Sequence, residues 1–146
     1  MEESVKQRLH KKYTVAEARA LNPLTLAYIG DGVYSEYIRR FLVSGGISNV
    51  NHLTRESIRY VKADGQAKMV QALMETLTAE EQAIVRRGRN TRSHVPKHAK
   101  IIDYRYATGL EALVGYLELT GQKERLEELM IQGISLLYNE NKNPAY

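Results

Sequence analysis

Apolar residues recur at helical spacing along almost every long segment of this 146-residue chain, whereas no segment shows a convincing strand alternation. The helical pattern covers residues 22–45, 50–77, 78–88, 103–120 and 122–139. No internal repeat connects these segments. The pattern therefore predicts an all-α fold.

Capping and breaking residues set the expected limits of the first helices. Asn22 is a good N-cap with Pro23 at the first helical position, and the glycine pair at 45–46 ends that helix. The segment 50–77 is expected to be interrupted or bent near residues 64–65, where an Asp-Gly pair occurs.

The later helices are bounded in the same way. The run Thr78-Ala-Glu-Glu81 is a capping box, and its helix is expected to stop by Gly88. Residues 90–100, which contain a proline, are expected to form a loop. Asp103 is a suitable cap for the next helix, which Gly121 terminates.

Length and composition predict one globular domain over residues 1–146, with a core at about 21–138 and a polar, mobile tail at 139–146. The chain has no cysteine, which excludes disulfides and thiolate metal sites and fits a reducing compartment. The N-terminus lacks the pattern of a signal peptide, and no apolar run approaches the roughly 20 residues that span a bilayer. We expect a soluble, cytoplasmic protein without a membrane partner.

Positive charge is concentrated in residues 86–100, which contain six lysines and arginines and no acid. Removing these charges from the net charge of +4 turns the rest of the chain negative. A polyanion is the natural partner of such a local patch, although a solvated basic loop without a partner is the alternative. The residues expected to bind the polyanion are Arg86, Arg87, Arg89, Asn90, Arg92, Lys97 and Lys100.

One carboxylate, Asp31, falls on an apolar helical face. Its companions at helical spacing are Leu24, Ala27, Tyr28, Tyr34, Ile38 and Phe41. A charge in such a place is costly unless it is paired or holds a metal. Gly30 and Gly32 weaken the helix by roughly 1 kcal/mol each, but they leave room for a phosphate or a second helix. We therefore expect Asp31 to be functional.

Glu111 is the second carboxylate of interest. The residues one helical turn away are all small or short, namely Ala107, Thr108, Val114 and Gly115. Two small-residue facets that each carry one acid can bring Asp31 and Glu111 to one point. Such oxygen ligands suit Mg²⁺ or Mn²⁺, which lower the pKa of bound water. The alternative is that each acid is structural and is satisfied by an arginine or a helix N-terminus.

The segments around both acids resemble the ribonuclease III family. The run Tyr28-Ile-Gly-Asp-Gly-Val33 is similar to the family's signature core, and the run from Tyr104 to Leu117 is similar to its second motif. The order, the separation and the total length resemble the mini-ribonuclease III branch, which has the nuclease domain without a double-stranded-RNA-binding domain. Larger members carry further acids at the positions occupied here by Leu24, Ala27 and Thr108, so the number of metal ions stays open.

The resemblance implies a ribonuclease III-like helical endonuclease domain in which Asp31 and Glu111 are the catalytic and metal-binding residues. The implied activity is Mg²⁺-dependent hydrolysis of phosphodiester bonds in double-stranded RNA. The implied substrate is precursor ribosomal RNA of the large subunit (23S rRNA). The resemblance also leaves open a ribosomal protein as a further partner. The resemblance also implies a homodimer with the Asp31 helix near its two-fold axis.

Other function classes stay open on the sequence. A non-catalytic helical RNA- or ribosome-binding module needs the basic stretch but neither acid, and a purely structural helical dimer needs none of these features. His94 and His98 stand four residues apart, but Pro96 lies between them and no third zinc ligand is evident. The ten tyrosines fit core and interface packing better than a base-stacking surface.

Overall fold

The computed structural model describes residues 1–142, and every regular element in that range is helical. The elements in chain order are α1 (Glu2–Leu9), α2 (Val15–Ala20), α3 (Pro23–Ser44), α4 (Val50–Val61), α5 (Ala63–Leu73), η1 (Met74–Thr76), α6 (Ala79–Asn90), α7 (Ile101–Leu119) and α8 (Lys123–Lys142). The predicted all-α fold is confirmed. Residues 143–146 of the predicted mobile tail lie outside the described residues, and residues 139–142 belong to α8, which corrects the predicted end of that helix.

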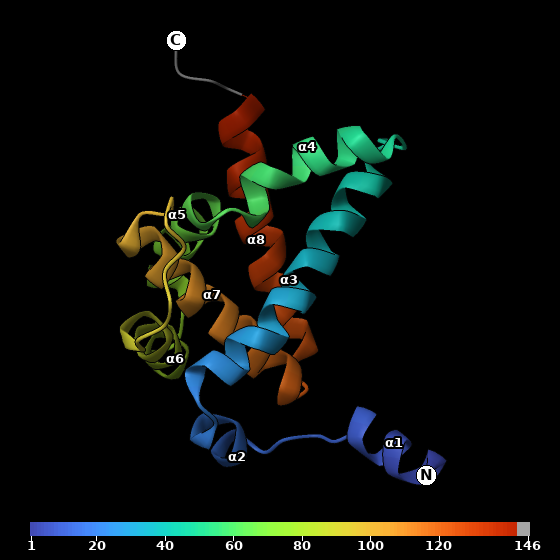
Figure 1. Ribbon diagram of the computed structural model, residues 1–146, viewed down its shortest axis with the longest axis vertical. Coiled ribbons are helices and arrows are strands. Elements are labelled where there is room, and N and C mark those ends of the chain that lie inside the picture. The colour runs from blue at the N-terminus through green and yellow to red at the C-terminus, as the bar shows by residue number, and fades with distance from the viewer. Residues whose placement is uncertain (143–146) are drawn as a thin grey trace.

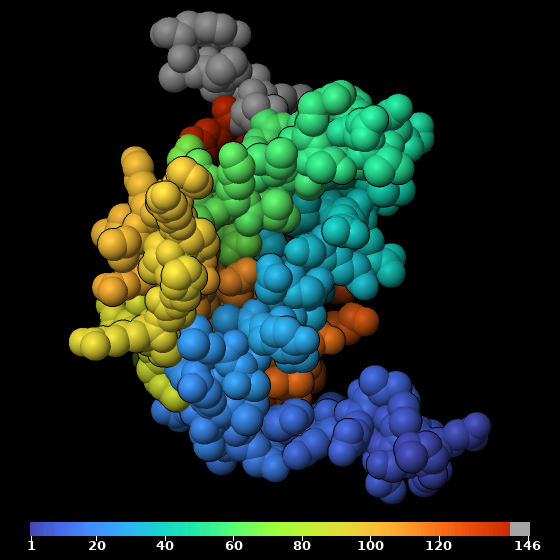
Figure 2. Space-filling view, in the orientation of Figure 1, coloured from blue at the N-terminus to red at the C-terminus, as the bar shows by residue number. Residues whose placement is uncertain are grey.

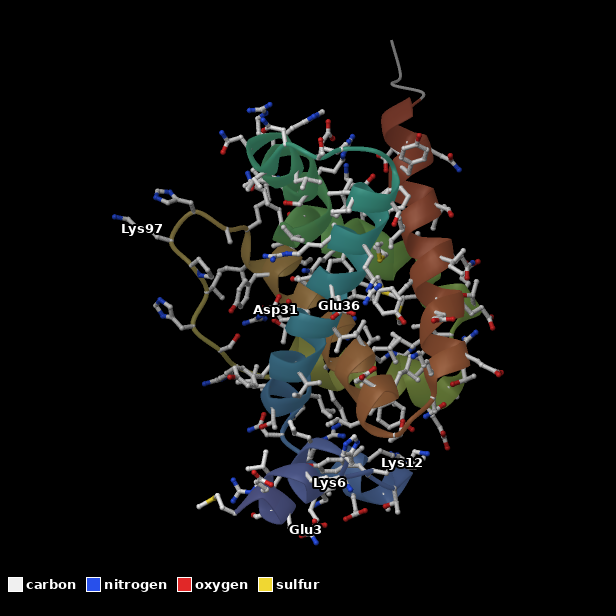
Figure 3. All side chains as sticks on the ribbon, turned by 90° about the vertical axis from the view of Figure 1, so that its right-hand side faces the viewer. Glu3, Lys6, Lys12, Asp31, Glu36 and Lys97 are labelled. Carbon is white, nitrogen blue, oxygen red and sulfur yellow. The ribbon has the colours of Figure 1, made fainter. Side chains whose placement is uncertain are left out.

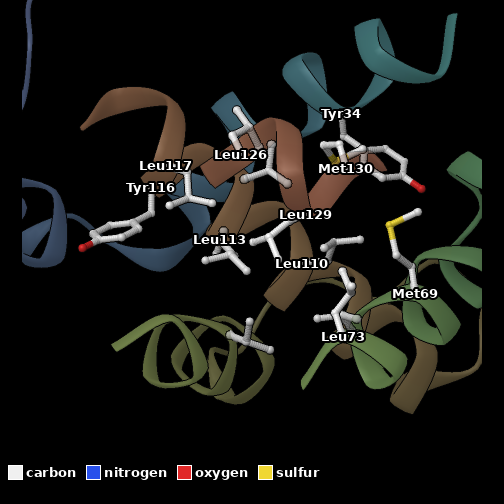
Figure 4. Packing of buried hydrophobic residues seen from close by; sticks show 14 of the residues in the cluster. Tyr34, Met69, Leu73, Leu110, Leu113, Tyr116, Leu117, Leu126, Leu129 and Met130 are labelled. Atoms are coloured by element: carbon white, nitrogen blue, oxygen red, sulfur yellow. The ribbon is translucent and has the colours of Figure 1, made fainter. Parts of the chain in front are cut away.

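Helix α7 forms the centre of the fold and packs against α3, α5, α6 and α8 (Figure 1). Its sequence is apolar or small on most sides, so it is buried almost continuously from residue 107 to residue 117. The close-up shows the side chains around it, with Leu110 of α7 between Leu73 of α5 and Leu129 of α8 (Figure 4). One apolar cluster therefore connects elements from α2 to α8.

Helices α3 and α7 cross at two glycines. A Cβ atom on Gly30 would collide with the carbonyl oxygen of Glu111, and a Cβ atom on Gly115 would collide with the carbonyl oxygen of Leu26. Both glycines have negative φ, so close backbone approach rather than conformational freedom requires them. The predicted close packing of these two helices is thus a direct backbone contact.

A second pair of glycines, Gly88 and Gly109, lies between α6 and α7. A Cβ atom on Gly88 would come within 2.9 Å of the Gly109 Cα atom. Gly88 therefore stays inside α6, which continues to Asn90 and is capped by Thr91. The predicted end of this helix at Gly88 is wrong, because the glycine serves packing rather than termination.

The segment 50–77 is broken, as predicted, but at Lys62 rather than at residues 64–65. Lys62 has an extended backbone (φ −67°, ψ 156°) that separates α4 from α5. Gly65 lies one turn later, where its lack of a side chain lets α5 pass the Arg59 carbonyl oxygen. The start of α7 also differs from the prediction. Helix α7 begins at Ile101 with Lys100 as its N-cap, and Asp103 lies in its first turn instead of capping it.

The sequence patterns missed the two short N-terminal helices. Helix α2 begins at a complete capping box between Thr14 and Glu17, whereas α1 has no buried residue and lies apart from the body of the molecule (Figures 1 and 2). The segment between them is fixed by the Tyr13 N–H, which donates to the Leu119 carbonyl oxygen at 3.0 Å. No helix in the described part of the chain is long and apolar enough to cross a membrane.

An ion pair between Glu81 and Arg125 connects the start of α6 to α8. The Arg125 guanidinium donates to both Glu81 oxygens, at 2.8 and 2.7 Å, and also to the Thr76 carbonyl oxygen at 3.0 Å. Glu81 is also the acid of the predicted Thr78 capping box, which the structure confirms. The hydrogen bonds from Arg125 lower the pKa of this buried carboxyl, so Glu81 is a structural acid.

The glycine crossing predicts a contrast between two neighbouring substitutions. Gly30→Ala should destabilise the protein by roughly 1–3 kcal/mol or prevent folding, because the new methyl group meets backbone that cannot move independently. Gly32→Ala meets nothing within 4 Å and should be neutral or stabilising by up to about 1 kcal/mol. Urea unfolding of both variants measures the difference, and equal midpoints would contradict the crossing.

Candidate active site between helices α3 and α7

The crossing of α3 and α7 places Asp31 next to Glu111. Asp31 follows Gly30 directly, and Glu111 provides the carbonyl oxygen against which Gly30 packs. The two carboxyl groups lie close enough that Asp31 raises the pKa of Glu111. The structure thus brings together the two acids that the sequence singled out, from helices far apart in the chain.

Asp31 is exposed, so its predicted place on the buried face of the helix is wrong. Tyr28 from the same predicted face is 82% exposed. The residues of α3 that are buried are Leu26, Ala27, Gly30, Tyr34, Ile38 and Leu42. The buried face is centred near Gly30 because that residue touches α7, and this rotation leaves Asp31 at the edge of the helix interface. In a side view, Asp31 lies on the side of α3 where the loop 91–100 is seen (Figure 3).

Glu111 is partly buried, and its surroundings disfavour the charged form. Burial is the largest effect and the Asp31 carboxyl is the next, and together they raise the pKa of Glu111 to about 8. The nearby side-chain amide of Gln66 acts in the opposite direction and lowers this pKa. An acid held in this way gains from any cation that replaces its proton.

Gln66 on α5 is a site residue that the sequence analysis missed. Its side chain is 2% exposed, its Nε2 donates to the Val61 carbonyl oxygen at 3.2 Å, and its Oε1 has no hydrogen-bond partner among the described residues. The available signal was a lone amide between the buried residues Gly65 and Ala67. Such an amide on an apolar helix face requires a polar partner from elsewhere in the fold.

Tyr34 closes the site on its inner side. Its hydroxyl donates to the Tyr60 carbonyl oxygen at 2.6 Å, which connects α3 to the last turn of α4. The pKa of Tyr34 is raised, first by burial and then by the negative charges of Glu111 and Tyr60. The phenol is therefore a neutral, fixed wall beside the acid pair.

The donor set fits a hard divalent cation that keeps most of its own water. Within residues 1–142 no group of three or more histidine, aspartate or glutamate side chains gathers as a metal cage. Two neighbouring carboxyls are available instead. Mg²⁺ is held in this manner by one or two carboxylates together with water and substrate phosphate. The positions where larger family members carry acids hold no charge here, and the Thr108 hydroxyl donates to the Tyr104 carbonyl oxygen at 3.0 Å.

The basic stretch is divided between two kinds of structure. Residues 86–90 belong to the last turns of α6, whereas residues 91–100 form the loop before α7, with Lys97 at its outer tip (Figure 3). The Arg87 guanidinium donates to the Arg19 carbonyl oxygen at 2.8 Å, so Arg87 is directed to the end of α2 rather than to the loop. The remaining residues predicted to bind RNA, other than Arg89, are exposed.

The acid pair predicts an unusual dependence of stability on pH in the absence of metal. Because Glu111 has a folded-state pKa of about 8, above the ordinary 4.5, the folded protein keeps a proton that the unfolded chain releases. The free energy of unfolding should therefore fall as the pH rises from about 4.5 to about 8. Glu111→Gln should lack this contribution and be more stable than the parent at pH 8, by about 2–5 kcal/mol.

Urea unfolding in EDTA at a series of pH values measures this effect. Glu118→Gln is the matched control, because it changes an exposed glutamate of the same helix and keeps the acid pair. Identical pH dependence in Glu111→Gln and in the parent would contradict the assigned environment of Glu111.

Comparison with known proteins identifies the family. The ribonuclease III domain model matches residues 24–122, which include both acids and the basic stretch. A mini-ribonuclease 3 of Enterococcus faecalis is 51% identical over 77% of this chain and 87% of its own length. A mini-ribonuclease 3 of Clostridium tetani is 42% identical over 92% of this chain and 91% of its own length.

A solved structure supports the same assignment at the level of the fold. A crystal structure of a Fusobacterium nucleatum protein superimposes with a TM-score of 0.73 at 26% identity, and covers 80% of this chain and 94% of that one. The match spans the helices that form the acid pair and the relatives are similar over nearly their whole length. The chain belongs to the ribonuclease III family and is an endoribonuclease similar to the mini-ribonucleases 3.

Proposed function

We propose that this protein is a Mg²⁺-dependent endoribonuclease that hydrolyses phosphodiester bonds of double-stranded RNA at the Asp31–Glu111 pair. The observation that carries the proposal is the meeting of two carboxyls, without an arginine or lysine partner among the described residues, at the crossing of α3 and α7. Two acids held against each other are destabilising for the fold and favourable for a divalent cation. Mn²⁺ has the same ligand preferences and is expected to substitute.

The residues at and around the acid pair have different proposed roles. Asp31 and Glu111 would hold the ion, which when bound polarises the phosphodiester and lowers the pKa of water. Asp31 is exposed, so substrate phosphate has access to it from solvent. Gln66 fixes one side of the Glu111 carboxyl from α5, and Tyr34 keeps the inner side closed to water. Glu111 must lose its proton to act as a ligand, so cation affinity should rise as the pH approaches 8.

RNA binding is assigned to the basic stretch on the end of α6 and the following loop. The residues are Arg86, Arg87, Arg89, Asn90, Arg92, Lys97 and Lys100, with Arg87 the least available because of its hydrogen bond to α2. Lysine and arginine contacts to phosphate give affinity with little sequence information. This suits a duplex, whose A-form shape and 2′-hydroxyls are accessible in the shallow minor groove.

The mini-ribonuclease III resemblance supports the finer assignments. We infer that residues 1–146 form one catalytic domain, that the protein acts in the cytoplasm, and that precursor 23S ribosomal RNA is its substrate, with a ribosomal protein as a further partner. A non-catalytic RNA- or ribosome-binding module is the second candidate, since the basic stretch alone would serve it. The destabilising acid pair disfavours that candidate, because a binding module gains nothing from it.

Removal of either carboxylate should separate cleavage from binding. Asp31→Asn and Glu111→Gln keep the shape of each side chain and remove a cation ligand, so cleavage of long duplex RNA in Mg²⁺ should fall by at least 100-fold. Duplex binding in EDTA should change by less than about threefold, because neither acid touches the basic stretch. Gel analysis of cleavage with Mg²⁺ and with EDTA, beside a binding titration, measures both. Full activity of either purified variant would refute the assigned site.

We further propose a homodimer formed through the outer face of α3. Most apolar residues of this helix are buried or half-buried within the protomer, but Tyr28 is 82% exposed, one turn before Asp31. A large exposed aromatic side chain is typical of an interface. A two-fold partner on this face would place two acid pairs near one RNA duplex, as cleavage of both strands requires.

A charge at Tyr28 should disrupt this assembly. Tyr28→Arg places a like charge opposite its symmetry mate and should give a 16.6 kDa monomer in sedimentation at micromolar concentration. Val43→Arg is the control, because Val43 is 56% exposed on the same helix but lies about 22 Å from Tyr28 along its axis. A monomeric parent that still cuts both strands would refute the dimer.

A further inference from the structure

A cavity of about 410 Å³ lies between the end of α6 and the first turns of α7. It is lined by Arg89, Asn90, Ile101, Ile102, Arg105 and Tyr106. Two of these residues, Arg89 and Asn90, belong to the basic stretch, whereas the other four lie beyond it and were not predicted to bind RNA. The cavity is separate from the Asp31–Glu111 pair but shares helix α7 with it.

Two guanidinium groups in this cavity lack a carboxylate partner. Neither Arg89 nor Arg105 forms an ion pair with an acid among the described residues. Arg89 is held in place by neutral groups, since it lies 5.5 Å from the centre of the Tyr106 ring and donates to the Asn90 side-chain oxygen at 3.3 Å. A positioned arginine without an acid is suited to an anionic ligand, because its charge is not already neutralised.

The other wall of the cavity is apolar and faces solvent. Ile101 is 57% exposed and Ile102 is 62% exposed, although both begin a helix whose later residues are deeply buried. A phosphate ion alone makes no use of such a wall. A nucleotide does, because its sugar and base present apolar faces next to the phosphate. The pairing of cations with isoleucines therefore points to a nucleotide rather than to a simple anion.

The cavity also lies within reach of an RNA strand at the acid pair. Arg105 precedes Glu111 by six residues on α7, which corresponds to about 9 Å along the axis. The loop 91–100 connects the two helix ends that line the cavity, and it lies on the side of α3 that carries Asp31 (Figure 3), so a duplex that contacts both the loop and the acid pair would lie beside the cavity. Binding here would fix the register of the strand relative to the acids.

We propose that this cavity is a ribonucleotide subsite in which Arg89 and Arg105 hold a phosphate and Ile101 with Ile102 contact the adjoining sugar or base. The inference rests on the proposed action on RNA and extends it to residues outside the basic stretch. The ligand is either a nucleotide of the duplex backbone or an unpaired nucleotide next to the duplex. The chemistry is the same for both, and the experiment separates them.

The test uses the full chain carrying Glu111→Gln, in EDTA, so that binding is measured without cleavage. Arg105→Ala should weaken binding of a blunt RNA duplex about tenfold and reduce the slope of log affinity against log salt by about one. Ile102→Ser should weaken binding without changing that slope, because it removes no charge. Lys123→Ala is the matched control, since it removes one exposed positive charge at the start of α8, beyond the far end of α7.

A second RNA duplex that carries one unpaired nucleotide distinguishes binding of the duplex backbone from binding of an unpaired nucleotide. Equal losses on both RNAs would assign the subsite to the duplex backbone, and a loss confined to the second RNA would assign it to an unpaired nucleotide. If Arg105→Ala behaves like Lys123→Ala on both RNAs, the subsite is refuted while the nuclease assignment stands. If the parent binds neither RNA, the proposed function fails together with the subsite.

Discussion

The backbone contact between α3 and α7 at Gly30 and Gly115 is the constraint on which the site depends. Any side chain at either position would force the two helices apart, because the groups that it meets are carbonyl oxygens of the opposite helix. The contact fixes Asp31 beside Glu111 and determines which side of α3 is buried. The same residues therefore specify the core and the position of the candidate acid pair.

Much of this arrangement is predictable from local patterns. The helical spacing, the Asn22 and Thr78 caps and the small residues around Glu111 identify the helices and the two that approach closely. Local patterns give the wrong prediction where a glycine can either end a helix or allow close packing of two helices. Gly88 resembles a terminator but packs against α7, and the exposure of Asp31 follows from the position of Gly30 rather than from the apolar stripe. Only the partner helix decides between these uses, and a single segment does not contain it.

Features that join distant segments cannot be predicted from local patterns, because no single segment contains both partners. Gln66 gives no motif, and its relation to Glu111 appears only when α5 packs against α7. The cavity beside Arg105 likewise combines the end of one helix with the start of another, across a loop of ten residues. The basic stretch is recognisable as a binding region in the sequence because its charges are adjacent, whereas Arg105 is a single charge beyond the loop. Charge clustering along a chain is thus an incomplete guide to charge clustering in space.

The contrast between Glu81 and Glu111 separates a structural acid from a candidate functional one. Both are shielded glutamates on helices. The sequence assigns Glu81 to the Thr78 capping box, and it leaves open that Glu111 is satisfied by an arginine or a helix N-terminus. Glu81 has both partners, Arg125 and the Thr78 cap, and its pKa is lowered. Glu111 has burial and a second acid as its main influences, and its pKa is raised. The fold stabilises the negative charge of Glu81 and opposes that of Glu111, so a charged Glu111 requires a cation. A hydrated cation and an RNA phosphate can both reach the exposed Asp31 beside it.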